Sequence, residues 1–166
     1  YPLAAPSANI SSRVSPVTKN HVKEEFGKKI KYIIDGGLSK IGLESTIINL
    51  TGKPEILRIG SIDINKLSKA LKKNLIYRKK TYMEVPGQNR LHYSPGIPLK
   101  MNCKEASLDE AFILMKKRNN SNKNFFYLSK NKNLKEAARN LYSVLRMIKK
   151  KGYKKIAVEK IENKGI

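Results

Sequence analysis

The sequence predicts an α/β protein with two folded units and a long irregular segment between them. Short apolar runs rich in β-branched residues alternate with amphipathic helical patterns, which is typical of α/β chains. This alternation stops in a segment that contains two Pro-Gly pairs, and then resumes. A segment of that length without periodicity is either functional or a linker. We therefore predict domains at residues 1–74 and 99–166, with a linker at 75–98.

The first unit combines strand patterns with two helical patterns. Ser15 can cap the first helix, because Pro16 at the first helical position needs no backbone hydrogen bond. Asp63 or Ser61 can cap the second helix, whose apolar residues repeat on one face. Strands are predicted at 3–5, 31–35, 45–50 and 55–58, and helices at 16–26 and from the second cap to about residue 71.

The second unit has the same mixed texture. We predict a helix at 108–117, a strand at 125–128, a helix at 134–150 and a strand at 155–159. Because a complete helix separates the last two strands, they should run parallel and be joined by a right-handed crossover.

The chain is strongly basic, with a net charge of +22 from 35 basic and 13 acidic residues. A positive surface attracts polyphosphate, which suggests nucleic acid as a partner. However, only seven of the basic residues are Arg and 28 are Lys, and Arg is the residue suited to bidentate phosphate contacts. A codon bias toward Lys, Asn and Ile explains the same composition, so both explanations stay open.

Cysteine and apolar content indicate the compartment. Cys103 is the only cysteine, so it cannot form an internal disulfide, and a reducing cytoplasm fits best. No apolar stretch approaches the roughly 20 residues of a membrane span, so we expect no membrane partner. The chain starts at Tyr1 within an apolar run and ends at Ile166 without a terminating signal. We expect it to be an internal piece of a longer protein.

A loop of small polar residues, 6–15, joins the first predicted strand to the first predicted helix. Free N–H groups and the helix dipole at such a junction favour an anion, so α/β proteins often bind phosphate there. Ser and Asn are also common in ordinary capped loops, and composition alone favours that simpler explanation.

Specific motifs in this loop and beyond it resemble one family. Residues 4–11, followed by Ser15-Pro16, are similar to the central signature of the YrdC-like family. Residues 42–48 and 56–60 resemble its second and third signatures, in the same order. Residues 90–95 resemble the Arg-x-His-Tyr-x-Pro segment of its longer, two-domain members. Ser12, Val14 and Ile59 depart from the family pattern, but none of these changes removes a ligand-contacting group.

This resemblance implies a fold and an activity. Residues 1–74 would be the C-terminal part of a twisted mixed-sheet YrdC-like domain, and the linker would fold back over a nucleotide site. Residues 99–166 would be an incomplete, small Rossmann-like domain. Two-domain members are L-threonylcarbamoyladenylate synthases, which convert L-threonine, bicarbonate and ATP to threonylcarbamoyl-AMP and pyrophosphate. A separate complex then uses this product to modify the adenosine beside the tRNA anticodon.

The same resemblance implies roles for individual residues. ATP would be bound by Ser7, Ser15, Arg58 and Tyr93, threonine by Ala5 and Ser45, with Asn9 and His92 in support. Simpler roles exist for several of them: Ser45 as a hydroxyl on a strand face, Arg58 paired with Glu44, and Tyr93 and His92 as packing residues. Any Mg²⁺ would be carried by the ATP phosphates, and one Cys with two distant His provides no structural zinc site.

The family's Lys-Arg segment, which holds the bicarbonate and phosphate charges, is absent from this chain. We therefore expect the 166 residues alone to lack synthase activity and to fold poorly. An alternative is a non-catalytic RNA-binding module, with weak RNA affinity from the positive charge. A third possibility is the carbamoyl-transfer domain of a hydrogenase-maturation protein, but the motif at 90–95 argues against it.

Overall fold

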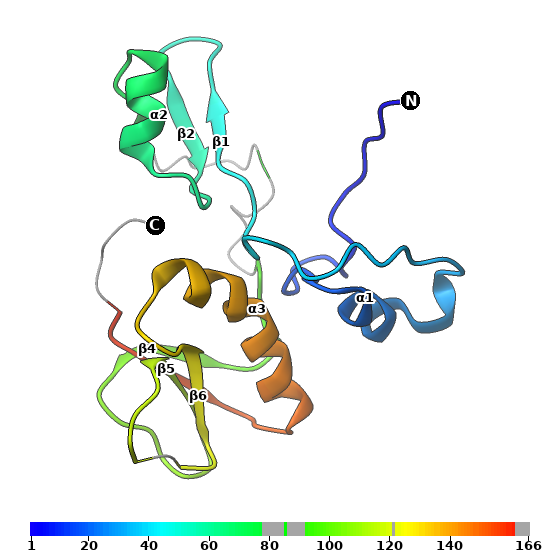
Figure 1. Cartoon of the computed structure of the whole chain (residues 1–166), viewed down its shortest axis with the longest axis vertical. Helices are drawn as coiled ribbons and strands as arrows, with labels where there is room; N and C mark the ends of the chain where they lie inside the picture. The colour runs from blue at the N-terminus through cyan, green and yellow to red at the C-terminus, as the bar shows by residue number, and fades with distance from the viewer. Residues whose placement is uncertain (78–84, 86–91, 121, 162–166) are drawn as a thin grey trace.

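The computed structural model describes residues 1–77, 85, 92–120 and 122–161, and contains two separate sheets (Figure 1). The first is mixed: β1 (Ile47–Asn49) is antiparallel to β2 (Glu55–Arg58), which is parallel to β3 (Ile76–Tyr77). Helix α2 (Ile64–Leu71) follows β2, and the Asp63 carboxylate accepts hydrogen bonds from the first N–H groups of this helix. The mixed sheet and the Asp63 cap agree with the sequence prediction.

The second sheet is entirely parallel. Its strands are β4 (Leu99–Cys103), β5 (Ala111–Lys116), β6 (Phe125–Ser129) and β7 (Ile156–Glu159), in the order β4-β7-β5-β6. The prediction of a helix at 108–117 is wrong, because this segment forms the central strand β5. Five consecutive residues of β5 are buried, and a run that is apolar on both sides suits a strand covered on both faces. Strand β4 was not predicted.

Helix α3 (Leu134–Lys150) has the predicted bounds and covers one face of this parallel sheet. Its cap is Asn133, whose side chain accepts from the N–H of Glu136. Strands β6 and β7, on either side of α3 in the chain, run parallel as predicted, but β5 lies between them, so they do not pair directly. The buried residues of α3 are Ala137, Ala138, Tyr142, Val144, Leu145 and Ile148.

Three predictions for the N-terminal part are wrong. Residues 3–5 and 31–35 are not strands, and Leu3 and Ile34 are more than nine-tenths exposed. Among the described residues no segment pairs with either run, so their backbone groups have no ladder to join. Helix α1 (Lys19–Phe26) begins later than predicted, with Thr18 as its cap instead of Ser15, and a short 3-10 turn, η1 (Gly27–Lys29), follows it.

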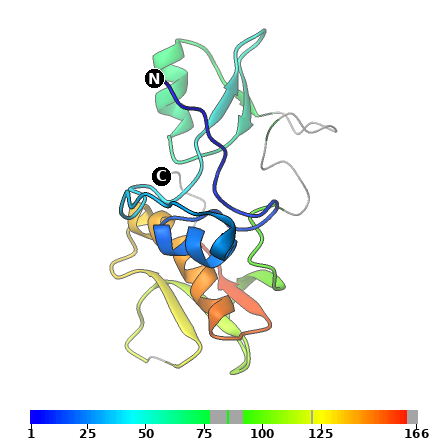
Figure 2. The same ribbon diagram turned by 90° about the vertical axis from the view of Figure 1, so that its right-hand side faces the viewer.

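The two halves of the chain share one hydrophobic core. Val14 and Val17, each 3% exposed, pack with residues of the second sheet and of α3. Helices α1 and α3 lie side by side (Figure 2), and ion pairs join them. Linker residues 78–84 and 86–91, which include Arg90 of the linker motif, lie outside the described residues. Within the described ranges, no helix has the length and apolar character needed to cross a membrane.

Candidate functional site

Arg58, the last residue of β2, is held by oxygen atoms from two other segments. Its Nε and Nη2 atoms donate to the Ser45 carbonyl and hydroxyl, at 3.0 and 3.1 Å. Its Nη1 donates to the Tyr93 hydroxyl at 3.1 Å. The pairing of β1 with β2 explains the first contacts, because it places Ile47, two residues after Ser45, opposite Arg58. The guanidinium plane is therefore fixed from two sides.

Glu44 links the N-terminal loop to the second half of the chain. One carboxylate oxygen accepts a hydrogen bond from the Ser15 hydroxyl at 2.5 Å, and the other accepts from the Tyr142 hydroxyl at 2.6 Å. Both donors are buried, with Ser15 8% and Tyr142 5% exposed. Tyr142 lies on α3, 98 residues from Glu44. One carboxylate thus joins the loop before α1 to the helix of the parallel sheet.

Tyr93 reaches this cluster because its segment pairs with the N-terminal loop. The Ser94 N–H donates to the Ser12 carbonyl at 2.9 Å, and the Val14 N–H donates to the Ser94 carbonyl at 3.2 Å. The Tyr93 ring stacks on Tyr142 with centroids 6.1 Å apart. Tyr93 has a φ of 54°, a backbone conformation that bulky residues rarely adopt. Such strained residues are concentrated at ligand sites.

Burial and charge keep both phenols of the cluster protonated. Burial raises the pKa of Tyr142 far above its usual value, and the hydrogen bond to the Glu44 carboxylate raises it further. Burial and the Glu44 charge also raise the pKa of Tyr93, and Arg58 opposes them. Both hydroxyl groups are therefore donors at neutral pH.

Two glycines of the family signatures allow close approach of the backbone. A Cβ at Gly60 would lie 2.3 Å from the Thr46 backbone nitrogen, so the chain beyond β2 can pass the Ser45 segment only with glycine. Gly42 has a φ of 79°, and a Cβ there would lie 2.8 Å from backbone atoms of Arg139 in α3. Gly42 thus brings the Glu44 segment directly against the helix that carries Tyr142.

The predicted site residues fall into two groups. Ser45, Arg58 and Tyr93 form one hydrogen-bonded group, and the stacking of Tyr93 on Tyr142 joins it to the group of Ser15, Glu44 and Tyr142 in a single cluster. His92 packs edge-on against Tyr93 with centroids 4.1 Å apart. The remaining three lie nearer the N-terminus.

Ala5 and Ser7 lie in an exposed segment without regular structure, and none of their described contacts reaches this cluster. Asn9 supports its own loop, because its Nδ2 donates to the carbonyls of Ile10 and Arg13.

Glu44 and Tyr142 were not among the predicted site residues. Glu44 stands beside Ser45 in the second signature, where it was considered only as a partner of Arg58. Tyr142 lies on the apolar face of a predicted helix, and a buried tyrosine needs a partner for its hydroxyl. That need was the only signal in the sequence for Tyr142.

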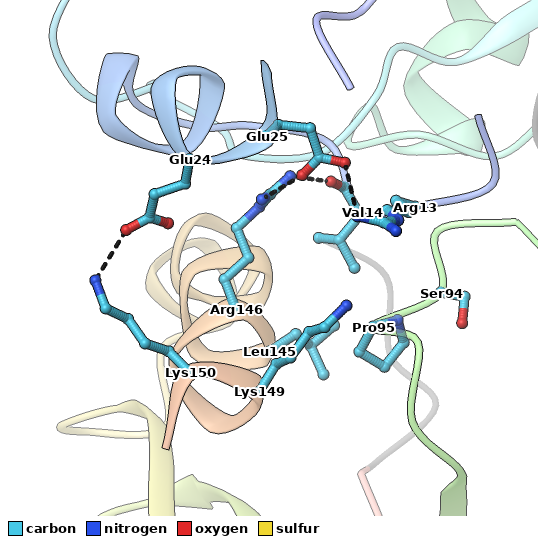
Figure 3. A pocket seen from close by; sticks show the side chains of 10 residues that line it. All are labelled: Arg13, Val14, Glu24, Glu25, Ser94, Pro95, Leu145, Arg146, Lys149 and Lys150. Atoms are coloured by element: carbon cyan, nitrogen blue, oxygen red, sulfur yellow. Dashed lines mark hydrogen bonds and ion pairs between the residues drawn. The ribbon is translucent and has the colours of Figure 1, made fainter. Parts of the chain in front are cut away.

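A cavity of about 350 Å³ lies beside this cluster, between α1, the segment at 94–95 and α3 (Figure 3). Arg146 projects from α3, donates to the Glu25 carboxylate at 2.9 Å, and also bonds the Val14 carbonyl. Lys150 pairs with Glu24 at 2.9 Å. Most of the charged side chains that line the cavity are therefore paired across the contact between α1 and α3.

The described residues contain no group of three His, Cys, Asp or Glu side chains that could hold a metal ion. The cluster instead presents a fixed, permanently charged guanidinium together with hydroxyl groups. This combination suits binding of an anion that also carries hydrogen-bonding groups.

Comparisons with known proteins give two family matches. Residues 1–60 match the family described as "Telomere recombination", and residues 58–166 match "Threonylcarbamoyl-AMP synthase, C-terminal domain". The threonylcarbamoyl-AMP synthase of Pyrococcus abyssi is 33% identical over 99% of this chain and 54% of its own length. The enzyme of the same name from Schizosaccharomyces pombe is 32% identical over 99% of this chain and 50% of its own length.

A solved structure agrees with these matches. The crystal structure of P. abyssi Sua5 complexed with L-threonine superimposes with a TM-score of 0.80 and 29% identity. The superposition covers 96% of this chain and 53% of that one. The chain thus spans about half the length of the relatives it matches.

Proposed function

This chain belongs to the threonylcarbamoyl-AMP synthase family, in its two-domain form, and from that premise we propose that it carries part of an active site. The complete protein would join L-threonine, bicarbonate and ATP into threonylcarbamoyl-AMP and release pyrophosphate. A separate tRNA-modifying complex would then consume the product. The observation that carries the proposal is the fixed Arg58 guanidinium between Ser45 and Tyr93.

The chemistry explains why such a group is needed. A carbamate oxygen must attack the α-phosphorus of ATP in line while pyrophosphate leaves. Nucleophile and electrophile are both anionic, so the site must supply positive charge and hold the two in line. Arg58 never loses its charge, and its planar donors match phosphate oxygens. We assign Arg58 to the nucleotide, together with Ser7 and Ser15.

The threonine side of the site would be formed by Ser45 and the main chain at Ala5. The relative from P. abyssi was solved in complex with L-threonine, which supports threonine as a ligand of this family. Tyr93 would close over ATP, with His92 packed behind it and Asn9 bracing the loop. His92 would pack or donate a hydrogen bond and would not act as a base, because the reaction needs charge compensation more than proton removal.

ATP enters as a substrate, and Mg²⁺ would accompany its phosphates, since this hard cation prefers phosphate oxygens. The complete enzyme would act in the cytoplasm, where the thiol of Cys103 remains reduced.

Product detection tests the proposal. The full-length protein that carries this chain should form threonylcarbamoyl-AMP, detectable by mass spectrometry, only when all three substrates are present. Arg58→Ala should abolish the product. Arg118→Ala is the matched control, because Arg118 pairs with Glu159 in the other sheet at 2.9 Å, and it should retain activity. Loss of product in both variants, or in neither, contradicts the assignment of Arg58.

A second candidate function is RNA binding, favoured by a basic hollow at the carboxyl edge of the parallel sheet. This hollow encloses about 940 Å³, and its lining includes Lys116, Lys117 and Arg118. Phosphate contacts make RNA binding weaken steeply with salt. A salt-dependent RNA affinity, combined with no effect of ATP on the melting temperature, would favour this function over the synthase.

A further inference from the structure

Tyr142 contacts the candidate site from outside the domain that contains the family signatures. It lies on α3, which covers the parallel sheet, and its hydroxyl donates to Glu44 at 2.6 Å. Its ring stacks on Tyr93, which in turn accepts from Arg58. Tyr142 therefore has direct contacts to two members of the cluster, one through its hydroxyl and one through its ring.

Other contacts of α3 differ from this one in kind. Arg146 and Lys150 lie one and two turns further along the helix and pair with Glu25 and Glu24 of α1. Those pairs fasten two helices together beside the cavity shown in Figure 3. The Tyr142 hydroxyl instead bonds the carboxylate that also holds Ser15. The contact is thus placed to affect the site itself.

The hydrogen-bonding capacity of Glu44 explains what the contact does. An ionised carboxylate only accepts, and here each oxygen receives one O–H donor. With both oxygens bonded, the carboxylate plane is fixed, and with it the direction of the Ser15 hydroxyl. If the Tyr142 hydroxyl is removed, the Glu44 oxygen that accepted from it loses this hydrogen bond. The carboxylate can then rotate away from Ser15.

Close packing makes the arrangement rigid. Gly42 brings the chain just before Glu44 against the backbone of Arg139, less than one helical turn from Tyr142. Tyr142 is only 5% exposed, so its ring has little freedom to follow a displaced carboxylate. Small displacements at the helix are therefore transmitted directly to Glu44.

We propose that Tyr142 is a positioning residue of the synthase site, which sets the orientation of Glu44 and, through it, of Ser15 for binding ATP. This inference rests on the proposed function. It gives the small C-terminal domain a direct part in nucleotide binding, beyond covering the sheet.

Steady-state kinetics of the full-length protein that carries this chain provide the test. Tyr142→Phe removes only the hydroxyl and keeps the stacked ring. Tyr153→Phe is the matched control, because it removes a tyrosine hydroxyl of the same domain that donates to the Lys123 carbonyl at 3.3 Å. Tyr142→Phe should raise the KM for ATP about tenfold with a smaller change in kcat, as expected for loss of a hydrogen bond to a charged group. Tyr153→Phe should leave KM unchanged.

A double-mutant cycle with Ser15→Ala separates positioning from general support. If Tyr142 acts through Glu44 on Ser15, Tyr142→Phe should add little to the KM of the Ser15→Ala protein. If Tyr142 had a purely structural role, Tyr142→Phe would lower the melting temperature, and its effect on KM would not depend on Ser15. If Tyr142→Phe fails to melt cooperatively, Glu44→Asp replaces it in the test. This substitution shortens the side chain by one methylene and breaks the same contact, so it should raise the KM for ATP in the same way.

The outcomes are distinct. An unsubstituted protein that makes no threonylcarbamoyl-AMP would overturn the proposed function and this inference with it. An active protein in which Tyr142→Phe behaves like Tyr153→Phe, or in which its effect persists undiminished in the Ser15→Ala protein, would overturn the inference alone.

Discussion

Arg146 donates to the Glu25 carboxylate at 2.9 Å, and both side chains are largely buried, 14% and 5% exposed. The pair joins α3 of the parallel sheet to α1 of the N-terminal part. Burial acts to raise the pKa of Glu25, but the hydrogen bonds from Arg146 and the Ile10 N–H, together with the charges of Arg146 and Arg13, outweigh it, and the pKa falls below its usual range. The contact between the two halves of the chain therefore includes a largely buried ion pair.

Breaking this pair from one side should be costly. Arg146→Ala should lower the free energy of unfolding by about 3 kcal/mol, because it leaves a buried carboxylate with less compensation. Lys150→Ala removes an exposed pair of the same two helices and should cost less than about 1 kcal/mol. Urea denaturation of the full-length protein measures both. Equal costs for the two substitutions would contradict the importance of burial.

Alanine substitutions at Gly37 and Gly42 distinguish the cost of backbone strain from the cost of a steric clash. Gly37 and Gly42 have φ values of 78° and 79°, but a Cβ at Gly37 meets nothing within 4 Å, whereas one at Gly42 meets the Arg139 backbone at 2.8 Å. Gly37→Ala should cost about 1 kcal/mol for its left-handed backbone. Gly42→Ala should cost roughly 1–3 kcal/mol more, because backbone must move. Denaturation curves of both variants test this, and similar costs would show that the close approach is unimportant.

The surroundings of His21 lead us to expect a loss of stability in mild acid. Its Nδ1 accepts a hydrogen bond from the Val17 N–H, and burial, followed by the nearby Arg146 charge, lowers its pKa below 6.5. The unfolded chain therefore binds a proton before the folded chain does, so stability is complete above about pH 6.5 and falls as pH decreases toward the folded pKa.

Melting temperatures between pH 7.5 and 5.5 measure this effect. They should decrease with pH in the unsubstituted protein and decrease less steeply in His21→Asn, which keeps an acceptor near the position of Nδ1 without the titration. Parallel curves for the two proteins would remove His21 as the cause.

Sequence patterns predicted local features well and long-range ones poorly. Helix α3 was predicted to both ends because its apolar period is a local signal. The five-residue apolar run of β5 fits a helix or a buried strand equally, so its prediction failed. Ser45 and Arg58 were predicted from motifs, and the pairing of β1 with β2 brings them together. The bond between Glu44 and Tyr142 spans 98 residues, which no local pattern encodes.

The hydrogen bond of the Ser15 hydroxyl leads us to expect a preference for ATP over its deoxyribose analogues. Its proton is donated to Glu44, so its oxygen is left to accept from a ligand. Ionised phosphate oxygens have no proton to donate, whereas ribose hydroxyls do. If Ser15 accepts from one ribose hydroxyl, the analogue that lacks this hydroxyl, 2′-deoxy-ATP or 3′-deoxy-ATP, should bind roughly tenfold more weakly than ATP. Ser15→Ala should abolish that difference, and calorimetric titration measures it. Equal affinity for all three nucleotides would contradict a sugar-binding role for Ser15.

We propose that Arg58, held by Ser45 and Tyr93, binds the nucleotide, and titration of a non-hydrolysable ATP analogue into the full-length protein tests this assignment most directly. Arg58→Lys keeps the charge but cannot reproduce the planar contacts, so the dissociation constant should rise roughly 10- to 100-fold with little change in melting temperature. Arg118→Lys changes an arginine that pairs with Glu159 of the other sheet, and this variant should bind the analogue as the unsubstituted protein does. Unchanged affinity in Arg58→Lys would contradict a nucleotide-binding role for Arg58.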